Sequence, residues 1–260
     1  MNTGQNVWPW LSLSPKVNGV YRLGPSSPAS SLYAAVRASE RRLLSDDQVR
    51  ELPSARDLWN AREWAIRARS MVRLKNVLKS QGTGLQVLEV GCGNGWLSGN
   101  LQRDGHHVLG LDPFTEEVEQ AARVFPQGPA FALGDLLSTT IPVAVFDSVL
   151  FPASIQYFKD PVSAIKKARI HLKPGGTIHV LDSVIYASER EAHQANMRSS
   201  IYFSGIGVPK MASHYHGHCL DAFRDLGALH ILERPSARWH WRSMLGRSNG
   251  PFTHLIIGPA

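Results

Sequence analysis

The sequence comprises 260 residues, of which 43% are hydrophobic and 19% are charged. This composition is typical of an ordinary globular protein with one sizeable buried core, and it excludes a disordered or fibrous chain. No apolar run approaches the roughly 20 residues that cross a bilayer, and residues 1–11 lack the pattern of a signal peptide. We therefore expect one catalytic domain and no membrane span.

Lys and Arg outnumber Asp and Glu by 28 to 21, which gives a formal net charge of +7 at pH 7. The basic residues are spread along the chain without the aromatic signature of an RNA-binding module, so solvated helix faces explain them and a nucleic-acid partner is disfavoured. The two cysteines are Cys92 and Cys219, and Cys92 lies in a glycine-rich loop where a disulfide would obstruct a ligand. A reducing, cytoplasmic location is the simpler interpretation.

In chain order, residues 1–53 are expected to be a lead-in to the main domain, which we place at residues 54–260. The Pro- and Ser-rich run at 24–31 predicts loop rather than core within residues 1–30. From about residue 54 to residue 80, apolar residues recur with helical spacing and no Gly or Pro interrupts them. This pattern predicts an N-terminal helical extension.

After residue 84, short apolar runs alternate with helical stretches, which is typical of a parallel sheet covered by helices on both faces. The chain is thus predicted to be a doubly wound, Rossmann-like α/β protein. The predicted helices are residues 95–104, 115–124 and 160–172, and the predicted strands are residues 85–90, 108–111, 130–133, 145–151, 177–181, 229–233 and 253–257. Residues 188–227 interrupt the alternation with predicted helices at 188–202 and 220–226, and we interpret them as an insertion on the substrate side.

The most informative segment is residues 87–95, in which a hydrophobic strand with a carboxylate runs into Gly91, Gly93 and Gly95. Alternate glycines let the main chain turn tightly and approach a ligand, and the helix that follows offers unpaired N–H groups. A nucleotide-like ligand fits such a loop. The dinucleotide fingerprint G-x-G-x-x-G requires a third glycine where this chain has Trp96, so a pyrophosphate is not expected.

This loop resembles motif I, E/D-x-G-x-G-x-G, of the class I S-adenosylmethionine-dependent methyltransferases. Residues 172–177 are similar to the L-K-P-G-G segment of the same family, and the resemblance spans residues 85–182, and more loosely residues 57–258. Within the family, the chain resembles the small-molecule group called methyltransferase type 11, which includes quinone-biosynthesis enzymes. The resemblance implies a seven-stranded, mostly parallel sheet with an antiparallel last strand.

The resemblance also implies the cofactor S-adenosylmethionine, which leaves as S-adenosylhomocysteine after methyl transfer. In the family the glycine loop holds the amino-acid end of the cofactor, an acid after the second strand holds the ribose, and an acid after the third strand holds the adenine amino group. The residues implied to bind the cofactor are Glu89, Gly91, Cys92, Gly93, Gly95, Asp112, Pro113, Asp135, Leu136 and Phe151.

Methyl transfer from a sulfonium depends mainly on alignment of the acceptor, but an acceptor of high pKa also needs a base, for which His is the usual candidate. His214, His216 and His218 lie in the insertion, and Tyr157 follows the fourth predicted strand. We take these four residues as catalytic candidates. In an extended segment the three histidines would share a face, so a metal site is an alternative and a structural role is another. We assign no metal.

The sequence leaves the acceptor and the methylated atom open, and it does not predict the oligomeric state. Arg234, Arg238 and Arg242 recur among tryptophans, which predicts either a cationic ridge for an anionic small molecule or a surface helix with Trp packed inward. The alternative functions are an RNA-modifying methyltransferase and a cofactor-free interaction module on the same fold. The D/N-P-P-Y motif of amino-group methylation is replaced by Phe-Pro-Ala-Ser at 151–154, which disfavours that class.

Overall fold

The computed structural model describes residues 7–54, 56–235 and 250–259. Within these residues the strands are β1 (Lys16–Val17), β2 (Val20–Arg22), β3 (Gln86–Val90), β4 (His107–Asp112), β5 (Ala130–Leu133), β6 (Phe146–Pro152), β7 (Leu172–Ser183), β8 (Ile185–Tyr186), β9 (His218–Cys219), β10 (Leu229–Glu233) and β11 (Thr253–Ile257). The α-helices are α1 (Ser30–Ser39), α2 (Asp46–Glu51), α3 (Ala61–Gln81), α4 (Trp96–Arg103), α5 (Thr115–Val124), α6 (Pro161–Ile170) and α7 (Glu189–Gly205). The short 3₁₀ helices are η1 (Pro9–Leu13), η2 (Ile155–Tyr157), η3 (Pro209–His214) and η4 (Leu220–Phe223).

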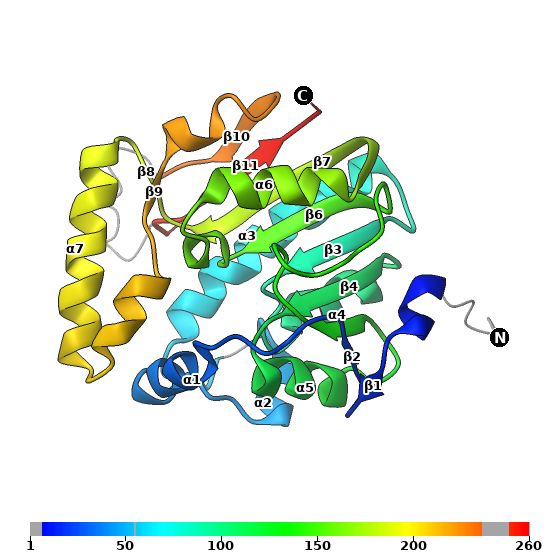
Figure 1. Ribbon diagram of the computed structural model, residues 1–260, viewed down its shortest axis with the longest axis horizontal. Helices are drawn as coiled ribbons and strands as arrows, with labels where there is room; N and C mark the ends of the chain where they lie inside the picture. The colour runs from blue at the N-terminus through cyan, green and yellow to red at the C-terminus, as the bar shows by residue number, and fades with distance from the viewer. Residues whose placement is uncertain (1–6, 55, 236–249, 260) are drawn as a thin grey trace.

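In the described part of the chain, nine strands form one sheet of order β1-β2-β5-β4-β3-β6-β7-β11-β10 (Figure 1). Neighbouring strands from β2 to β7 pair in parallel, whereas β11 runs antiparallel to both β7 and β10. The doubly wound α/β fold and the antiparallel last strand are therefore confirmed. The short strands β8 and β9 pair separately from the large sheet.

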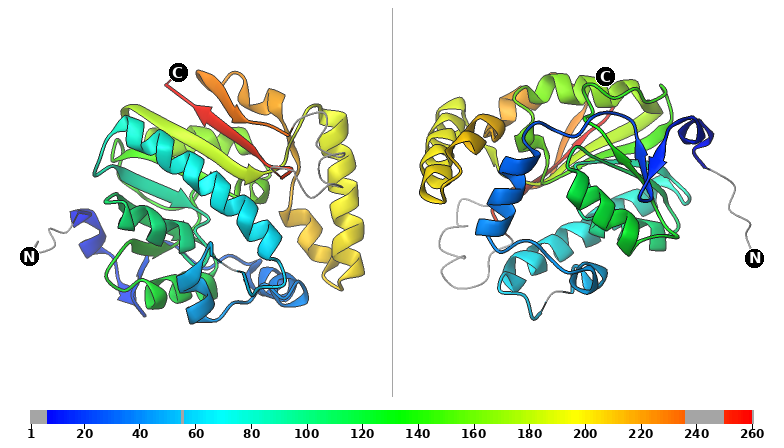
Figure 2. Two further views of the ribbon diagram at one scale, coloured as in Figure 1. Left: turned by 180° about the vertical axis from the view of Figure 1, so that it is seen from behind. Right: turned by 60° about the horizontal axis from the view of Figure 1, so that its bottom comes forward.

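The two faces of the sheet bury alternate residues of each strand, as the pleat of a β-strand requires. On one face, Leu88 and Val90 pack in the cluster that also contains the apolar side of α6. On the other face, Val87 packs in the cluster formed by α3 and α4, and α3 runs across this face in Figure 2. Leu74 and Leu78 of α3 are fully buried, and each such side chain contributes about 1.5–3 kcal/mol to folding. These contacts hold the strand ends in fixed positions.

The expectation that residues 1–30 lie outside the core is wrong. Trp8 and Leu11 are buried in the main cluster, and β2 pairs with β5 through Tyr21 and Ala132. The sheet consequently has nine described strands where seven were expected. Strands of two and three residues are too short to show a period in the sequence, and β2 joins the sheet through a partner more than 100 residues away. The domain boundary at residue 53 stays a prediction.

Smaller differences concern the ends of elements. The helix expected from about residue 54 begins at Ala61, after turns in which the N–H of Ala61 donates to the carbonyl of Leu58 at 2.9 Å. The helix expected at 220–226 is only the 3₁₀ helix η4, whereas the helix expected at 188–202 is present as α7. None of the described helices has the length and apolar character of a membrane span.

Candidate active site

A cavity of about 480 Å³ lies at the carboxyl ends of the central parallel strands. The segments that follow β3, β4, β6 and β7 line its base, while α1, the first two turns of α3, α7 and η3 contribute its walls. The neighbours of β3 are β4 on one side and β6 on the other, so the direction of the strand order reverses there. Doubly wound sheets bind their ligands outside the carboxyl ends of the strands at such a reversal. The topology of the fold thus creates this cavity.

The glycine loop after β3 has the left-handed backbone that its sequence suggests. The φ angles of Gly91, Gly93 and Gly95 are +75°, +51° and +74°. A Cβ atom on Gly91 would lie 2.5 Å from Cβ of Ser154, and one on Gly95 would lie 2.7 Å from the ring of Phe131. Gly91 and Gly93 line the cavity, whereas Gly95 precedes α4 and packs against the sheet. The loop therefore exposes main chain to the cavity at its first two glycines.

Asp112 at the end of β4 fixes the position of the glycine loop. Its Oδ2 accepts a hydrogen bond from the N–H of Gly93 at 2.8 Å, and its Oδ1 accepts one from the N–H of Phe114 at 2.9 Å. Burial raises the pKa of Asp112 to about 7, against the effect of the two N–H donors. Each carboxylate oxygen has a second acceptor site, so Asp112 can still bind ligand hydroxyls.

Glu89 places a second buried carboxyl beside the loop. Only 1% of the residue is exposed, and the hydroxyl of Ser98 donates a hydrogen bond to Oε2. Burial raises the pKa of Glu89 to about 8, although the bond from Ser98 acts in the opposite direction. A cationic group bound near it would favour the ionised form, because an opposite charge stabilises a carboxylate. Glu89 and Asp112 together make this end of the cavity attractive to a cation.

Farther along the sheet edge, Asp135 and Leu136 follow β5 and line the same cavity as Pro113. Oδ1 of Asp135 accepts the N–H of Leu137 at 2.7 Å, while the side chain of Leu136 is buried. This end therefore combines an exposed carboxylate with apolar surface. Such a combination suits a flat heterocycle that carries a hydrogen-bond donor.

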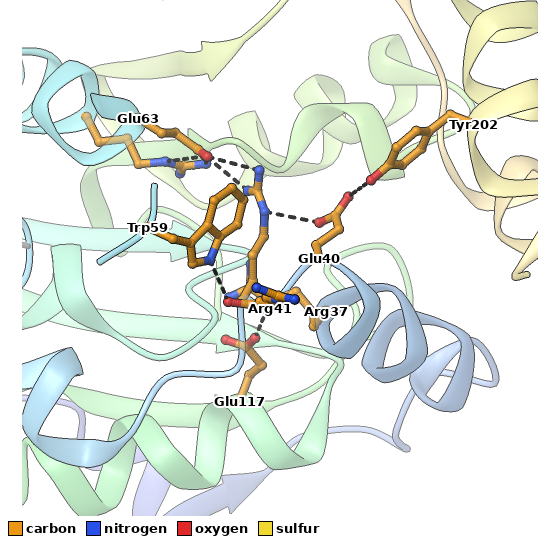
Figure 3. A network of polar contacts seen from close by, with 9 residues as sticks. Arg37, Glu40, Arg41, Trp59, Glu63, Glu117 and Tyr202 are labelled. Atoms are coloured by element: carbon orange, nitrogen blue, oxygen red, sulfur yellow. Dashed lines mark hydrogen bonds and ion pairs between the residues drawn. The ribbon is translucent and has the colours of Figure 1, made fainter. Parts of the chain in front are cut away.

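The segment around α1 lines the cavity, and a network of polar contacts joins this segment to its neighbours (Figure 3). Nε of Arg37 donates to Glu117 of α5 at 3.0 Å, and the hydroxyl of Tyr202 on α7 donates to Glu40 at 2.6 Å. The rings of Tyr33 and Phe114 stack with their centroids 4.0 Å apart. These contacts attach α1 to α5, to α7 and to the segment after β4.

A second set of ion pairs joins the end of α1 to α3. The guanidinium of Arg42 lies 3.1 Å from Glu40 and 2.9 Å from Glu63, and Arg67 lies 2.9 Å from the same Glu63. The side chains of these pairs are 15–27% exposed, so solvent screens them less than surface pairs. Among the described residues that line the cavity, the guanidinium groups are those of Arg37, Arg42 and Arg67, and each is paired with a glutamate.

Aromatic and histidine side chains line the end of the cavity away from Asp135. The rings of Tyr157 and Tyr215 meet edge to face at 5.7 Å. Burial raises the pKa of Tyr157, so its hydroxyl stays protonated at neutral pH. Burial lowers the pKa of His216, which therefore stays neutral and can accept a proton. His214 also lines this end, whereas the buried His218 points its Nε2 toward the carbonyl of Ile155 at 3.2 Å.

The family model described as "Methyltransferase domain" matches residues 88–180, which include the glycine loop and the acids after β4 and β5. Residues 88–180 thus match a methyltransferase domain. The malonyl-[acyl-carrier protein] O-methyltransferase of Erwinia pyrifoliae is 32% identical over 97 residues, or 37% of each chain. The ubiquinone biosynthesis O-methyltransferase of Vibrio cholerae is 35% identical over 147 residues, or 54% of this chain and 55% of that protein. The chain thus spans about half or less of the length of these curated relatives.

Solved structures share the fold of the methyltransferase domain. The magnesium protoporphyrin IX methyltransferase of Synechocystis, solved with bound SAH, has a TM-score of 0.56 at 15% identity and covers 89% of this chain and 95% of that chain. The YcgJ protein of Bacillus has a TM-score of 0.51 at 20% identity and covers 67% of this chain and 77% of that chain. At these identities the likeness shows a common architecture.

Most residues predicted from the sequence meet in the cavity of the methyltransferase domain. Those that line it are Glu89, Gly91, Cys92, Gly93, Asp112, Pro113, Asp135, Leu136, Tyr157, His214 and His216. Three predicted residues do not line it. Gly95 packs against Phe131, and the fully buried Phe151 packs against Phe158. His218 is buried outside the cavity, with its Nε2 near the carbonyl of Ile155. No cluster of three or more His, Cys, Asp or Glu side chains in the described ranges is arranged to hold a metal ion.

Sequence reasoning missed several residues that line the cavity of the methyltransferase domain, among them Tyr33, Arg37, Glu117 and Asp182. The signal for α1 was the helical spacing of its apolar residues, which the Pro- and Ser-rich run before it obscured. The signal for Asp182 was its position directly after a predicted strand, which places it at the carboxyl edge of the sheet. Arg238 and Arg242 of the predicted cationic ridge lie outside the described residues.

Proposed function

We propose that this protein transfers the methyl group of S-adenosylmethionine to a small or medium-sized molecule in the cytoplasm. The observation that carries the proposal is the balance of charged side chains among the described residues that line the cavity. Its three guanidinium groups are all paired with glutamates, whereas Glu89, Asp112 and Asp135 have no cationic partner among the described ion pairs. Such a lining favours a cationic sulfonium cofactor over the pyrophosphate of a dinucleotide. The two cysteines are free and buried, which supports the reducing location.

In this proposal the cofactor lies along the carboxyl edge from β3 to β5. The main chain of Gly91, Cys92 and Gly93 holds the amino-acid end, with Glu89 beside its ammonium group. Asp112 binds the ribose hydroxyls, since its oxygens keep free acceptor sites next to the N–H groups of the loop. Asp135, Leu136 and Pro113 enclose the adenine.

The acceptor would lie at the opposite end, against Tyr157, His214 and His216. The neutral His216 can take up a proton from the acceptor, and Tyr157 can donate a hydrogen bond to it. An anionic acceptor stays a prediction that depends on residues 236–249, because the described lining offers no guanidinium without a carboxylate partner. Closure by α1 would exclude water from the reacting atoms.

Calorimetric titration with S-adenosylhomocysteine tests the proposal. Asp112→Ala removes the acceptor for the ribose and for two main-chain N–H groups, so we expect affinity to fall by about 10- to 100-fold, or roughly 1.4–2.8 kcal/mol. Asp221→Ala is the matched control, because Asp221 pairs on the surface with Arg224 and does not line the cavity. Circular dichroism would show that both variants fold. A folded wild-type protein that does not bind the ligand, or unchanged affinity in Asp112→Ala, would contradict the proposal.

A further inference from the structure

Asp182 is a buried carboxyl group at the base of the cavity, at the carboxyl end of β7. The residue is 4% exposed, and its Oδ1 makes no hydrogen bond with any described residue. The hydroxyl of Ser70 bonds to the carboxyl group, and burial raises its pKa above the ordinary value. The nearby Arg67 forms its ion pair with Glu63 instead. Because buried polar atoms in folded proteins are almost always hydrogen-bonded, this oxygen is suited to a ligand.

The backbone at Asp182 is also unusual. Asp182 has φ +55° and Ala153, at the end of the neighbouring strand β6, has φ +51°. The N–H of Ala153 donates to the carbonyl of Leu181 at 2.8 Å, so the two strand ends are joined at this point. Both residues line the cavity. Left-handed backbone at residues other than glycine is unfavourable and concentrates at functional sites.

A buried donor lines the same cavity. Nε1 of Trp64 on α3 has no hydrogen-bond partner within the described residues, and Trp64 is 7% exposed. Its ring meets Trp96 edge to face at 5.5 Å, and the guanidinium of Arg67 lies over it at 5.4 Å. The positive charge of Arg67, one turn along α3, also acts on Asp182 and lowers the pKa of its carboxyl group against the larger effect of burial. Asp182 therefore offers an unused acceptor to the cavity, and Trp64 on the adjoining helix offers an unused donor.

We propose that Oδ1 of Asp182 accepts the hydrogen bond of the hydroxyl or amino group that becomes methylated, while Nε1–H of Trp64 donates to a neighbouring acceptor atom of the same molecule. This inference rests on the proposed function. The oxygen or nitrogen lone pair forms the bond to the methyl carbon, the C–S bond breaks, and its electron pair returns to sulfur as a thioether. In this inference Asp182 takes the place of His216 as the base, so the proton of the hydroxyl or amino group passes to the carboxylate of Asp182 and then to solvent. A carboxylate acceptor carries no such proton and would be repelled by Asp182.

The test uses three probes that share an aromatic ring: catechol, benzylamine and benzoate. Each is incubated with S-adenosylmethionine labelled in its methyl group and with wild-type protein, Asp182→Asn or the surface control Asp221→Asn. We expect the wild type to methylate catechol or benzylamine and not benzoate. Asp182→Asn keeps the shape of the side chain and cannot take the proton, so turnover should fall at least about 100-fold, and its dependence on pH should flatten. Asp221→Asn should behave as wild type.

Binding of S-adenosylhomocysteine separates this inference from the proposed function. Asp182→Asn should bind that ligand within about twofold of wild type and melt at no lower temperature, because it loses a buried acid that forms no ion pair among the described residues. If the wild type does not bind the ligand, the proposed function fails. If it binds, the role of Asp182 is overturned by equal turnover in Asp182→Asn, by methylation of benzoate, by no turnover of catechol or benzylamine, or by a large loss of thermal stability in the variant.

Discussion

Gly91→Ala tests whether the glycine loop is required by its geometry. At φ +75° an L-residue is strained by about 1–2 kcal/mol. The added Cβ would also lie 2.5 Å from Cβ of Ser154, whose hydroxyl donates to the carbonyl of Val90 at 2.6 Å and which is 5% exposed. Ser154 cannot rotate away from a clash at its own Cβ, so the backbone must shift, at a further cost of about 1–3 kcal/mol. The sum predicts a loss of about 2–5 kcal/mol in the free energy of unfolding.

Gly105→Ala is the matched control. Gly105 has φ +89°, and a Cβ there would meet nothing within 4 Å, so only the backbone strain of about 1–2 kcal/mol applies. Urea denaturation should therefore find Gly91→Ala less stable than Gly105→Ala by about 1–3 kcal/mol. Titration with S-adenosylhomocysteine should show affinity reduced at least tenfold in Gly91→Ala and unchanged in Gly105→Ala. Equal stability and equal affinity in the two variants would refute the argument that Ser154 leaves no room at this loop.

Two further predictions concern buried charge. Glu89→Gln should stabilise the unliganded protein at pH 8 and not at pH 4. Burial raises the pKa of Glu89 to about 8, so the folded wild type keeps a proton that the unfolded chain releases above pH about 4.5. The wild type therefore loses stability as pH rises from about 4.5 to 8, by at most roughly 4–5 kcal/mol. Thermal denaturation at both pH values measures this, and an equal effect at both would contradict it. Arg37→Gln breaks the partly buried pair with Glu117 and should weaken binding of S-adenosylhomocysteine about three- to tenfold, while Arg50→Gln, which breaks an exposed pair, should not. Equal affinity in the two variants would show that α1 does not close the site.

The part of the site that could be predicted is the part encoded locally. The strand before Gly91 and the helix after Gly95 each follow from a short period of apolar residues, and the loop between them follows from its glycines. Asp112 and Asp135 each follow a predicted strand, and parallel strands bring their carboxyl ends to one edge. Sequence order alone therefore placed these acids on the correct side of the sheet.

The remainder depends on contacts between distant segments. Arg37 and Glu117 are 80 positions apart, and neither has a local pattern that indicates an ion pair. The histidines show a different limit of local reasoning. A common face for His214, His216 and His218 requires one continuous extended segment, but η3 ends at His214 and β9 begins at His218. The change of backbone between them turns His218 away from the cavity that His214 lines.

A crystal structure of the protein with S-adenosylhomocysteine tests the central claim most directly. We expect the amino-acid end of the ligand to lie against the main chain of Gly91 and Gly93, its ribose hydroxyls to bind Asp112 and its adenine to lie between Asp135 and Leu136. Crystals grown with saturating ligand in which this cavity is empty, or in which the ligand lies elsewhere on the protein, would contradict it.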